Sequence, residues 1–180
     1  MQFHINQKST INNSQFLLLI SIFSFIFTGC AQEKAYHQML KTLYKNTVPL
    51  IMPDTVKNVI TGKSHFVLLD TREIEEYKVS HIRSAKCAGY DHFDVASLED
   101  IAKDDTIIVY CSVGYRSERI GEKLFKEGYS HVYNLYGGIF EWVNKGYPLV
   151  DKKGQPTEKI HAYSKFWGKW LIKGQKVYGK

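Results

Sequence analysis

The chain has few cysteines, no internal repeat and no long apolar run, and each shortage excludes a class of protein. Three cysteines are too few for a disulfide framework or a four-cysteine zinc cage. We find no Gly-x-y period, no sustained heptad and no repeat of roughly 20–50 residues, which excludes collagen, coiled-coil and solenoid architectures. The seven histidines are scattered without the spacing of metal ligands, so we expect no metal and no cofactor.

The longest apolar run, FLLLISIFSFIF, covers 12 residues at positions 16–27. A helix that spans a bilayer needs about 20 apolar residues, whereas the apolar part of a secretory signal has about 7–15. Thr28, Gly29 and Cys30 follow, and this run resembles the lipobox of bacterial lipoproteins, in which the cysteine becomes the lipidated N-terminus after cleavage. We therefore predict a lipoprotein-type signal peptide over residues 1–29.

Lipidation of Cys30 would place the protein outside the cytoplasm. We expect an exported lipoprotein that is anchored in a membrane of the cell envelope and faces the periplasm or the exterior. Several acyl chains on one residue satisfy the rule that stable anchoring takes more than a single chain. An ordinary cleaved signal and an uncleaved anchor are the alternatives.

Basic residues are concentrated at the C-terminal end of the chain. Of the net charge of +6, residues 30–150 contribute 15 Lys and Arg against 16 Asp and Glu, whereas residues 151–180 contribute eight Lys against two acids. This basic C-terminal extension also carries Tyr163, Trp167, Trp170 and Leu171. We expect it to pack back on the preceding domain, with contact to a membrane or a partner as the alternative. Nucleic acid is not expected, because an exported protein rarely meets it.

Short apolar runs alternate with helical stretches in the middle of the chain. Residues 30–52 read as an N-terminal linker with a helix over 31–48 and a short strand at 50–52. Buried strands are expected at 66–69, 106–110 and 132–135, and helices at 54–61 (with Asp54 as N-cap), 73–78, 116–127 and 139–145. This alternation predicts an α/β fold with a mostly parallel sheet, whose sites lie beyond the carboxyl ends of the strands.

The stretch YCSVGYRS, residues 110–117, carries the chemistry. A buried strand ends there at Cys111, and Arg116 opens a helix. Backbone N–H groups at a helix start have no partner within the helix, so the short loop between them can form an anion nest that holds the cysteine as thiolate. Gly114 gives this loop its backbone freedom, and Arg116 can hold a sulfate-like group with a bidentate contact.

Four blocks in order resemble the rhodanese-like, single-domain sulfurtransferases. They are LLDTREIEEY (68–77), HIRSA (81–85), YCSVGYRS (110–117) and YNLYGGIFEWVNKGYPL (133–149). The resemblance implies a rhodanese-like domain over residues 53–150, with a five-stranded, mostly parallel sheet flanked by helices. It also implies a catalytic cysteine that cycles through a persulfide, which assigns this role to Cys111.

The same resemblance assigns a function and its supporting residues. The expected reaction moves sulfane sulfur from a small anionic donor such as thiosulfate to a thiophilic acceptor, such as a thiol or a protein. Binding of the substrate is assigned to the rest of the loop, Ser112, Val113, Gly114, Tyr115, Arg116 and Ser117. Asp70 and Arg72 are expected to form a supporting pair that fixes the loop, and Glu118 and Arg119 are expected to be solvated.

Several alternatives stay open. A non-catalytic rhodanese module for partner binding or redox sensing would be favoured by a missing cysteine, but Cys111 and Arg116 are both present. A thiol-redox enzyme could pair Cys111 with Cys87, although we expect Cys87 to be a small buried residue. Related phosphatases have a loop one residue longer than the six residues from Cys111 to Arg116, which disfavours that reaction.

Two positions depart from the family pattern. Ser80 and Ser84 stand where the family has glycines beside its second block. If the backbone at either position needs a positive φ, the serine introduces a small strain without the loss of a catalytic group.

Overall fold

The computed structural model describes residues 31–62 and 65–179. The predicted signal peptide and Cys30 lie outside the described residues. The chain divides into two compact units, residues 1–36 and residues 37–180. Residues 31–43 are helical, and no helix within the described ranges is long and apolar enough to cross a membrane. The remaining description concerns the second unit.

A five-stranded sheet with the order β1-β5-β4-β2-β3 forms the centre of this unit. Its strands are β1 (Leu50–Ile51), β2 (Val67–Asp70), β3 (Lys86–Cys87), β4 (Thr106–Tyr110) and β5 (His131–Leu135), and all four pairings are parallel. This confirms the predicted α/β fold with a five-stranded parallel sheet. The apolar pattern indicated four of these strands, but it gave no sign of the short, exposed β3.

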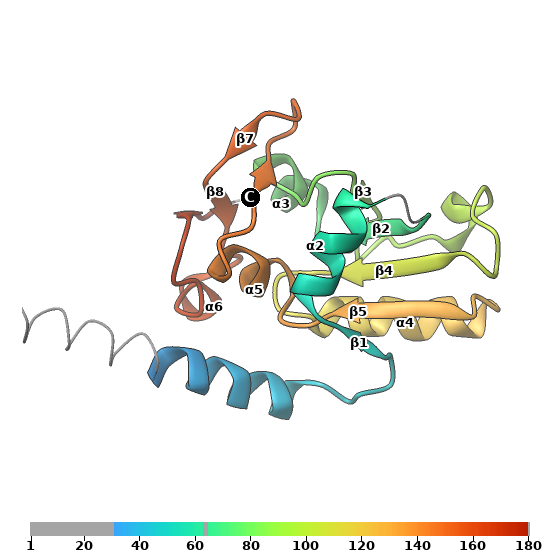
Figure 1. Cartoon of the computed structure of the whole chain (residues 1–180), viewed down its shortest axis with the longest axis horizontal. Helices are drawn as coiled ribbons and strands as arrows, with labels where there is room; N and C mark the ends of the chain where they lie inside the picture. The colour runs from blue at the N-terminus through green and yellow to red at the C-terminus, as the bar shows by residue number, and fades with distance from the viewer. Residues whose placement is uncertain (1–30, 63–64, 180) are drawn as a thin grey trace, which may run out of the picture. The chain divides into compact units, whose positions relative to one another are not determined.

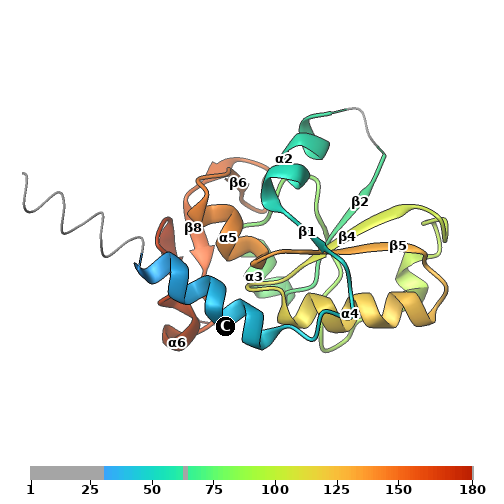
Figure 2. The ribbon, with the colours of Figure 1, turned by 60° about the horizontal axis from the view of Figure 1, so that its bottom comes forward.

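Helices cover both faces of the sheet. They are α2 (Pro53–Thr61), α3 (Ile74–Val79), α4 (Tyr115–Lys126), α5 (Gly138–Asn144) and a 3-10 turn, η1 (Val95–Leu98). In Figure 2, α4 lies on one side of the sheet and α2 on the other. The N-terminal helix ends at residue 43, five residues earlier than predicted, and the chain then reaches β1 without regular secondary structure.

The side chains of β4 show why the central strands are continuously apolar. Ile107 and Val109 join a core cluster with Ile120 and Leu124 of α4. Ile108 points to the opposite face because strand side chains alternate, and it too is almost completely buried. A parallel sheet with helices on both sides therefore requires apolar residues at successive positions.

The first turn of α2 corrects the predicted N-cap. Met52 is the N-cap residue, and Pro53 occupies the first helical position, where its missing N–H costs no hydrogen bond. Asp54 lies inside the first turn and pairs with Lys145 at 2.9 Å and with the Tyr147 hydroxyl. Asp54 therefore connects α2 with the chain that follows α5 and does not cap its own helix.

The two serines that replace family glycines differ in their backbone. Ser84 has a φ of 70°, in the left-handed region, whereas Ser80 has a φ of −170° and is extended. Only Ser84 therefore carries the strain expected of a non-glycine residue at that position.

The C-terminal extension packs against the rest of this unit. It follows β6 (Leu149–Val150) and contains β7 (Pro156–Thr157), β8 (Lys159–His161), α6 (Lys165–Gly168) and β9 (Gln175–Val177). β6 and β7 form an antiparallel hairpin, and β8 pairs in parallel with β9. The extension gathers near α5, at the end of the sheet toward which the arrow of β4 points (Figure 1).

Buried side chains hold the extension in place. Ile160 and Ala162 are fully buried, Leu171 is nearly so, and β8 lies against α3. The Asn144 side chain of α5 donates to the carbonyl of Trp170 and accepts from the backbone N–H of Ile172. These contacts agree with the expectation that the extension packs back, although Trp167 and Trp170 stay partly exposed.

We predict that Ile160→Ala lowers the free energy of unfolding by about 2–4 kcal/mol, because it leaves a cavity beneath the extension. Ile172→Ala, at an exposed position of the same extension, should change it by less than about 0.5 kcal/mol. Urea unfolding of both variants measures the difference. Equal stabilities of the two variants would contradict a docked extension. If these variants also bound liposomes more weakly than the wild type, the membrane alternative would be favoured.

Candidate active site

The loop between β4 and α4 holds Cys111, the residue to which the sequence assigned the catalytic role. Cys111 follows the last residue of β4 and is 1% exposed, and its Sγ accepts a hydrogen bond from the backbone N–H of Gly114 at 3.2 Å. Gly114 caps α4 with a φ of 97°. A Cβ atom at this position would collide with the Tyr44 ring, so both the backbone and the packing require glycine here.

The carbonyls at the start of the loop are paired with the helix behind it. The first turn of α5 donates two hydrogen bonds, from the Ile139 N–H to the Cys111 carbonyl at 2.9 Å and from the Phe140 N–H to the Ser112 carbonyl at 3.1 Å. The approach is close enough that a Cβ atom on Gly138 would overlap the Cys111 carbonyl. These bonds pair the carbonyl oxygens of Cys111 and Ser112 with α5.

Tyr44 and Asn134 pair with the other two carbonyls of the loop. The Tyr44 hydroxyl donates to the Val113 carbonyl at 2.7 Å and accepts from the Gly137 N–H at 2.8 Å. The Asn134 amide donates to the Gly114 carbonyl at 2.9 Å. Burial raises the pKa of Tyr44 well above its ordinary value, so its hydroxyl remains a donor at neutral pH.

Glu118 fastens the segment that carries Tyr44. Its carboxylate accepts hydrogen bonds from the backbone N–H groups of Lys45 and Thr47 at 3.1 and 3.0 Å. Glu118 is 1% exposed, so the expectation that it is solvated was wrong.

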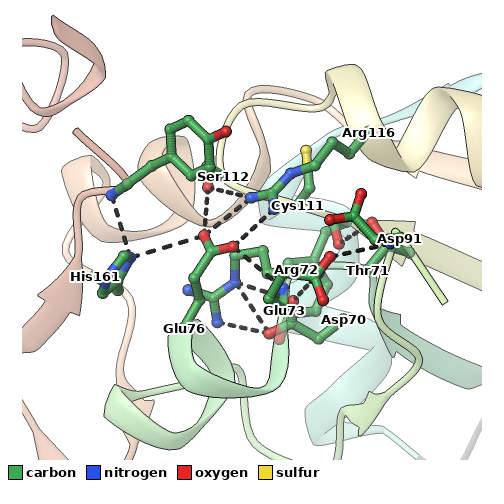
Figure 3. A network of polar contacts seen from close by, with 12 residues as sticks. Asp70, Thr71, Arg72, Glu73, Glu76, Asp91, Cys111, Ser112, Arg116 and His161 are labelled. Carbon is green, nitrogen blue, oxygen red and sulfur yellow. Dashed lines mark hydrogen bonds and ion pairs between the residues drawn. The ribbon is translucent and has the colours of Figure 1, made fainter. Parts of the chain in front are cut away.

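A bidentate ion pair joins α3 to the start of α4. Arg116 Nη1 and Nη2 donate to Glu76 Oε2 and Oε1 at 2.7 and 2.9 Å, and Nη2 also donates to Ser112 Oγ at 3.1 Å (Figure 3). Burial acts to raise the pKa of Glu76, but the hydrogen bonds and positive charge of Arg116, with the charge of Arg72, bring it below its ordinary value. The bidentate edge of Arg116, which the sequence assigned to an anionic substrate, is therefore occupied by Glu76.

Asp70 and Arg72 form a second, fully buried pair beneath the loop. Arg72 Nε and Nη2 donate to Asp70 at 2.9 and 2.6 Å, and Nη2 also donates to the Ser80 carbonyl at 2.6 Å. Between them, the backbone N–H of Thr71 donates to the Tyr110 carbonyl at 2.8 Å. The pair fixes the end of β2 beside the end of β4 and does not border the cavity described next.

A cavity of about 340 Å³ opens over the Cys111 sulfur. Its walls come from the loop, from the chain around residues 73 and 90, and from the C-terminal extension. The lining residues are Glu73, Tyr90, Asp91, Cys111, Ser112, Val113, Tyr115, Arg116, Tyr163 and Trp167. Cys111 thus borders a space large enough for a small organic molecule.

Most of the residues assigned from the sequence meet at this cavity. Cys111, Ser112, Val113, Tyr115 and Arg116 line it, and Gly114 donates to the sulfur from below. Ser117 does not: it is fully buried and its hydroxyl donates to Asn134 Oδ1 at 2.7 Å. The assignment of Ser117 to substrate binding is corrected to a positioning role.

The sequence reasoning missed three groups of residues. Glu76 was inside a quoted block, so its pairing with Arg116 could have been suspected from that block. Asn134 was likewise inside a quoted block, whereas Tyr44 gave no signal because it contacts the loop from a distant part of the chain. Tyr163 and Trp167 were identified only as members of the basic extension.

Cys87 lies in β3 and is exposed, which corrects the expectation of a buried residue. In the register of the sheet, Cys87 of β3 pairs with Asp70 of β2, and Asp70 pairs with Tyr110 of β4. Cys87 is therefore two strands away from Tyr110, the residue before Cys111. Two strand spacings, about 9–10 Å, exceed the reach of a disulfide. Burial of its thiol and the charge of Asp70 raise the pKa of Cys87, which disfavours a redox role with Cys111.

No cluster of three potential metal ligands occurs among the described residues.

Comparison with known proteins places the chain in a family. The model of the rhodanese-like domain matches residues 52–145, more than half of the chain. The chain therefore belongs to the rhodanese-like family, as the sequence blocks indicated.

Three curated relatives illustrate the range of the family. The chain is 36% identical to a sulfurtransferase of Allochromatium vinosum over 35% of this chain and 59% of the relative. It is 30% identical to a thiosulfate sulfurtransferase of Coxiella burnetii over 46% and 77% of the two chains. It is 27% identical to a tRNA uridine(34) hydroxylase of Bdellovibrio bacteriovorus over 61% and 37%. The chain thus spans less than two thirds of the first and third relatives.

A solved structure supports the same fold. The crystal structure of a rhodanese-like domain protein from Staphylococcus aureus is 27% identical, with a TM-score of 0.51 over 58% of this chain and 98% of that chain.

We predict that Glu76→Gln lowers the free energy of unfolding by about 2–4 kcal/mol near neutral pH, because it leaves the guanidinium of Arg116 without its counter-ion. The folded-state pKa of Glu76 is lowered, so its contribution is present above the unfolded pKa of about 4.3 and is lost as the pH falls through the folded value. The wild type should therefore lose more stability than Glu76→Gln between about pH 7 and pH 3.

Glu75→Gln is the matched control, since Glu75 lies in the same helix, is exposed, and pairs with the exposed Lys78. It should change stability by less than about 1 kcal/mol. Urea unfolding across the pH range measures all three proteins, and parallel pH profiles for the wild type and Glu76→Gln would contradict the prediction.

Proposed function

We propose that the protein is a sulfurtransferase that carries sulfane sulfur on Cys111. In the first step the Cys111 thiolate attacks the outer sulfur of a donor such as thiosulfate, the S–S bond of the donor breaks, and sulfite leaves with the bonding electron pair. In the second step a thiolate or cyanide attacks the outer sulfur of the persulfide, and Cys111 departs as thiolate. Each step conserves atoms and charge, and neither needs an outside oxidant.

The position of the Cys111 sulfur carries this proposal. The sulfur lies at the base of the cavity, accepts the Gly114 N–H, and is surrounded by a loop whose carbonyls are paired with groups behind it. A nest of this kind favours a thiolate before transfer and a persulfide anion after it. The names of the sulfurtransferase relatives support the same role at the level of the family.

Arg116 takes a different part from the one that its residue type suggests. The bidentate edge of Arg116 is occupied by Glu76, which neutralises its charge. At the cavity, Arg116 therefore acts mainly by orienting Ser112. The sulfur donor is then held chiefly by backbone N–H groups of the loop. Such groups stabilise the negative charge that develops on sulfur during the transfer.

Incubation with thiosulfate should add the mass of one sulfur atom to Cys111, and cyanide should remove it as thiocyanate. Cys111→Ser should abolish turnover because a hydroxyl cannot carry the persulfide. Cys87→Ser should load sulfur as the wild type does, and a failure to do so would favour the redox-pair alternative. Undiminished transfer by Cys111→Ser, or phosphatase activity of the wild type, would overturn the proposal. Binding of a partner without any sulfur loading would identify a non-catalytic module.

We also propose that Cys30 anchors the protein to a membrane of the cell envelope. The support is the apolar run of 12 residues that ends just before Thr28, Gly29 and Cys30. Cys30→Ser should release the protein from membranes or leave an unprocessed precursor. Mass spectrometry of the mature wild-type protein tests this directly, and an N-terminus elsewhere with no acyl mass would refute it.

A further inference from the structure

The C-terminal extension supplies part of the active-site wall. Tyr163 and Trp167 line the cavity over Cys111 together with Tyr90 and Tyr115. The matched family region ends at residue 145, so two of these four aromatic residues come from outside it. The extension therefore shapes the space in which the substrate must fit.

Backbone contacts fix the place of Tyr163. Its N–H donates to His161 Nδ1 at 3.2 Å, and His161 Nε2 contacts the Gly179 carbonyl at 2.6 Å. Tyr163 has a φ of 62°, a conformation that is unfavourable for a bulky side chain. Its ring lies 5.0 Å from the guanidinium of Arg116, and it is 53% exposed. A strained backbone thus holds a half-exposed ring over the active-site ion pair.

The charges around the cavity favour a cationic over an anionic organic acceptor in the second step of the proposed reaction. Its charged lining residues are Glu73, Asp91 and Arg116, and the charge of Arg116 is balanced by Glu76. Although the extension is rich in lysine, none of its lysines lines the cavity. The walls therefore present aromatic faces and two carboxylates that pair with no basic side chain of the lining, although Glu73 accepts the backbone N–H of Asp91 at 3.1 Å and caps α3.

From this arrangement we infer that the sulfur acceptor is an organic thiol that carries an ammonium group, selected by the aromatic wall of the extension and by Glu73 and Asp91. Aromatic faces attract cations through the quadrupole of the ring, and the carboxylates add charge complementarity. The transfer step is attack of the acceptor thiolate on the outer sulfur of the Cys111 persulfide, which yields the acceptor persulfide and the Cys111 thiolate. This inference rests on the proposed function, because it concerns the second step of that reaction.

The experiment compares three small thiols of similar size that differ in charge. Cys111 is loaded with inorganic polysulfide, excess reagent is removed, and the loaded protein reacts with cysteamine, 2-mercaptoethanol or 3-mercaptopropionate. Mass spectrometry follows the loss of the extra sulfur. The selectivity is the ratio of the rate constants for cysteamine and 3-mercaptopropionate, compared between variants so that the intrinsic reactivity of each thiol cancels.

The wild type should show a selectivity roughly three- to tenfold higher than Tyr163→Gly/Trp167→Ala. Glycine suits the φ of position 163, so this change relieves strain while it removes the ring. Asp91→Asn, at an exposed position, should lower the selectivity roughly two- to fivefold and tests the charge without any change of packing. Tyr163→Phe keeps the ring and should keep the selectivity, as should the control Ile172→Ala. Added salt should narrow the preference of the wild type.

Each outcome supports or overturns the inference. Equal selectivity in the wild type, Asp91→Asn and the double variant overturns it, as does a preference for 3-mercaptopropionate that the double variant retains. If Cys111 never takes up sulfur from polysulfide or thiosulfate, the proposed function fails and the inference falls with it. That failure is visible in the loading step, before any acceptor is added.

Discussion

The structure depends on one constraint, which is the direction of the carbonyl groups in the loop that holds Cys111. An N–H group can face the sulfur only if the neighbouring carbonyls find acceptable partners elsewhere, because a buried unpaired carbonyl costs free energy. Four such carbonyls are paired by α5, by β5 and by Tyr44. The packing of α5, β5 and the segment of Tyr44 around the sheet holds these partners in place. This is why residues as distant as Tyr44 and Gly138 bear on the nucleophile without a contact to its sulfur.

The pair of Glu76 and Arg116 has a second consequence beyond the union of two helices. A cation next to Cys111 would normally attract anions, but a carboxylate in bidentate contact cancels most of that field. The Arg116 guanidinium also donates a hydrogen bond to Ser112 and lies over the ring of Tyr163. His161 Nδ1 lies 3.8 Å from Glu76 Oε1, so the extension approaches both members of the pair. The electrostatics of the cavity are therefore set jointly by the domain and by the segment that follows it.

The sequence predicted the fold where the signal was local. The apolar runs of β2, β4 and β5 and the glycine-terminated helices were visible because burial on both faces leaves its mark on consecutive residues. β3 was not visible, since two exposed residues carry no such mark. The site was predictable only as far as the loop itself. Pairing of Glu76 with Arg116 joins residues 40 positions apart, so periodicity does not encode it, and only the quoted block that contains Glu76 gave a hint of it. The exposure of Cys87 and the strain at Ser84 likewise follow from tertiary placement.

The extension and the cavity cannot vary independently. The position of the Tyr163 ring is set by a backbone hydrogen bond to His161 and by a left-handed φ, more than by packing around the ring, which is half exposed. The neighbouring Ile160 and Ala162 are fully buried, so the same short segment is both an anchor and a wall. Because packed cores resist small displacements, any change that loosens this anchor also moves the ring over Arg116. A stability defect in the extension should therefore displace the Tyr163 ring before the parallel sheet itself is affected.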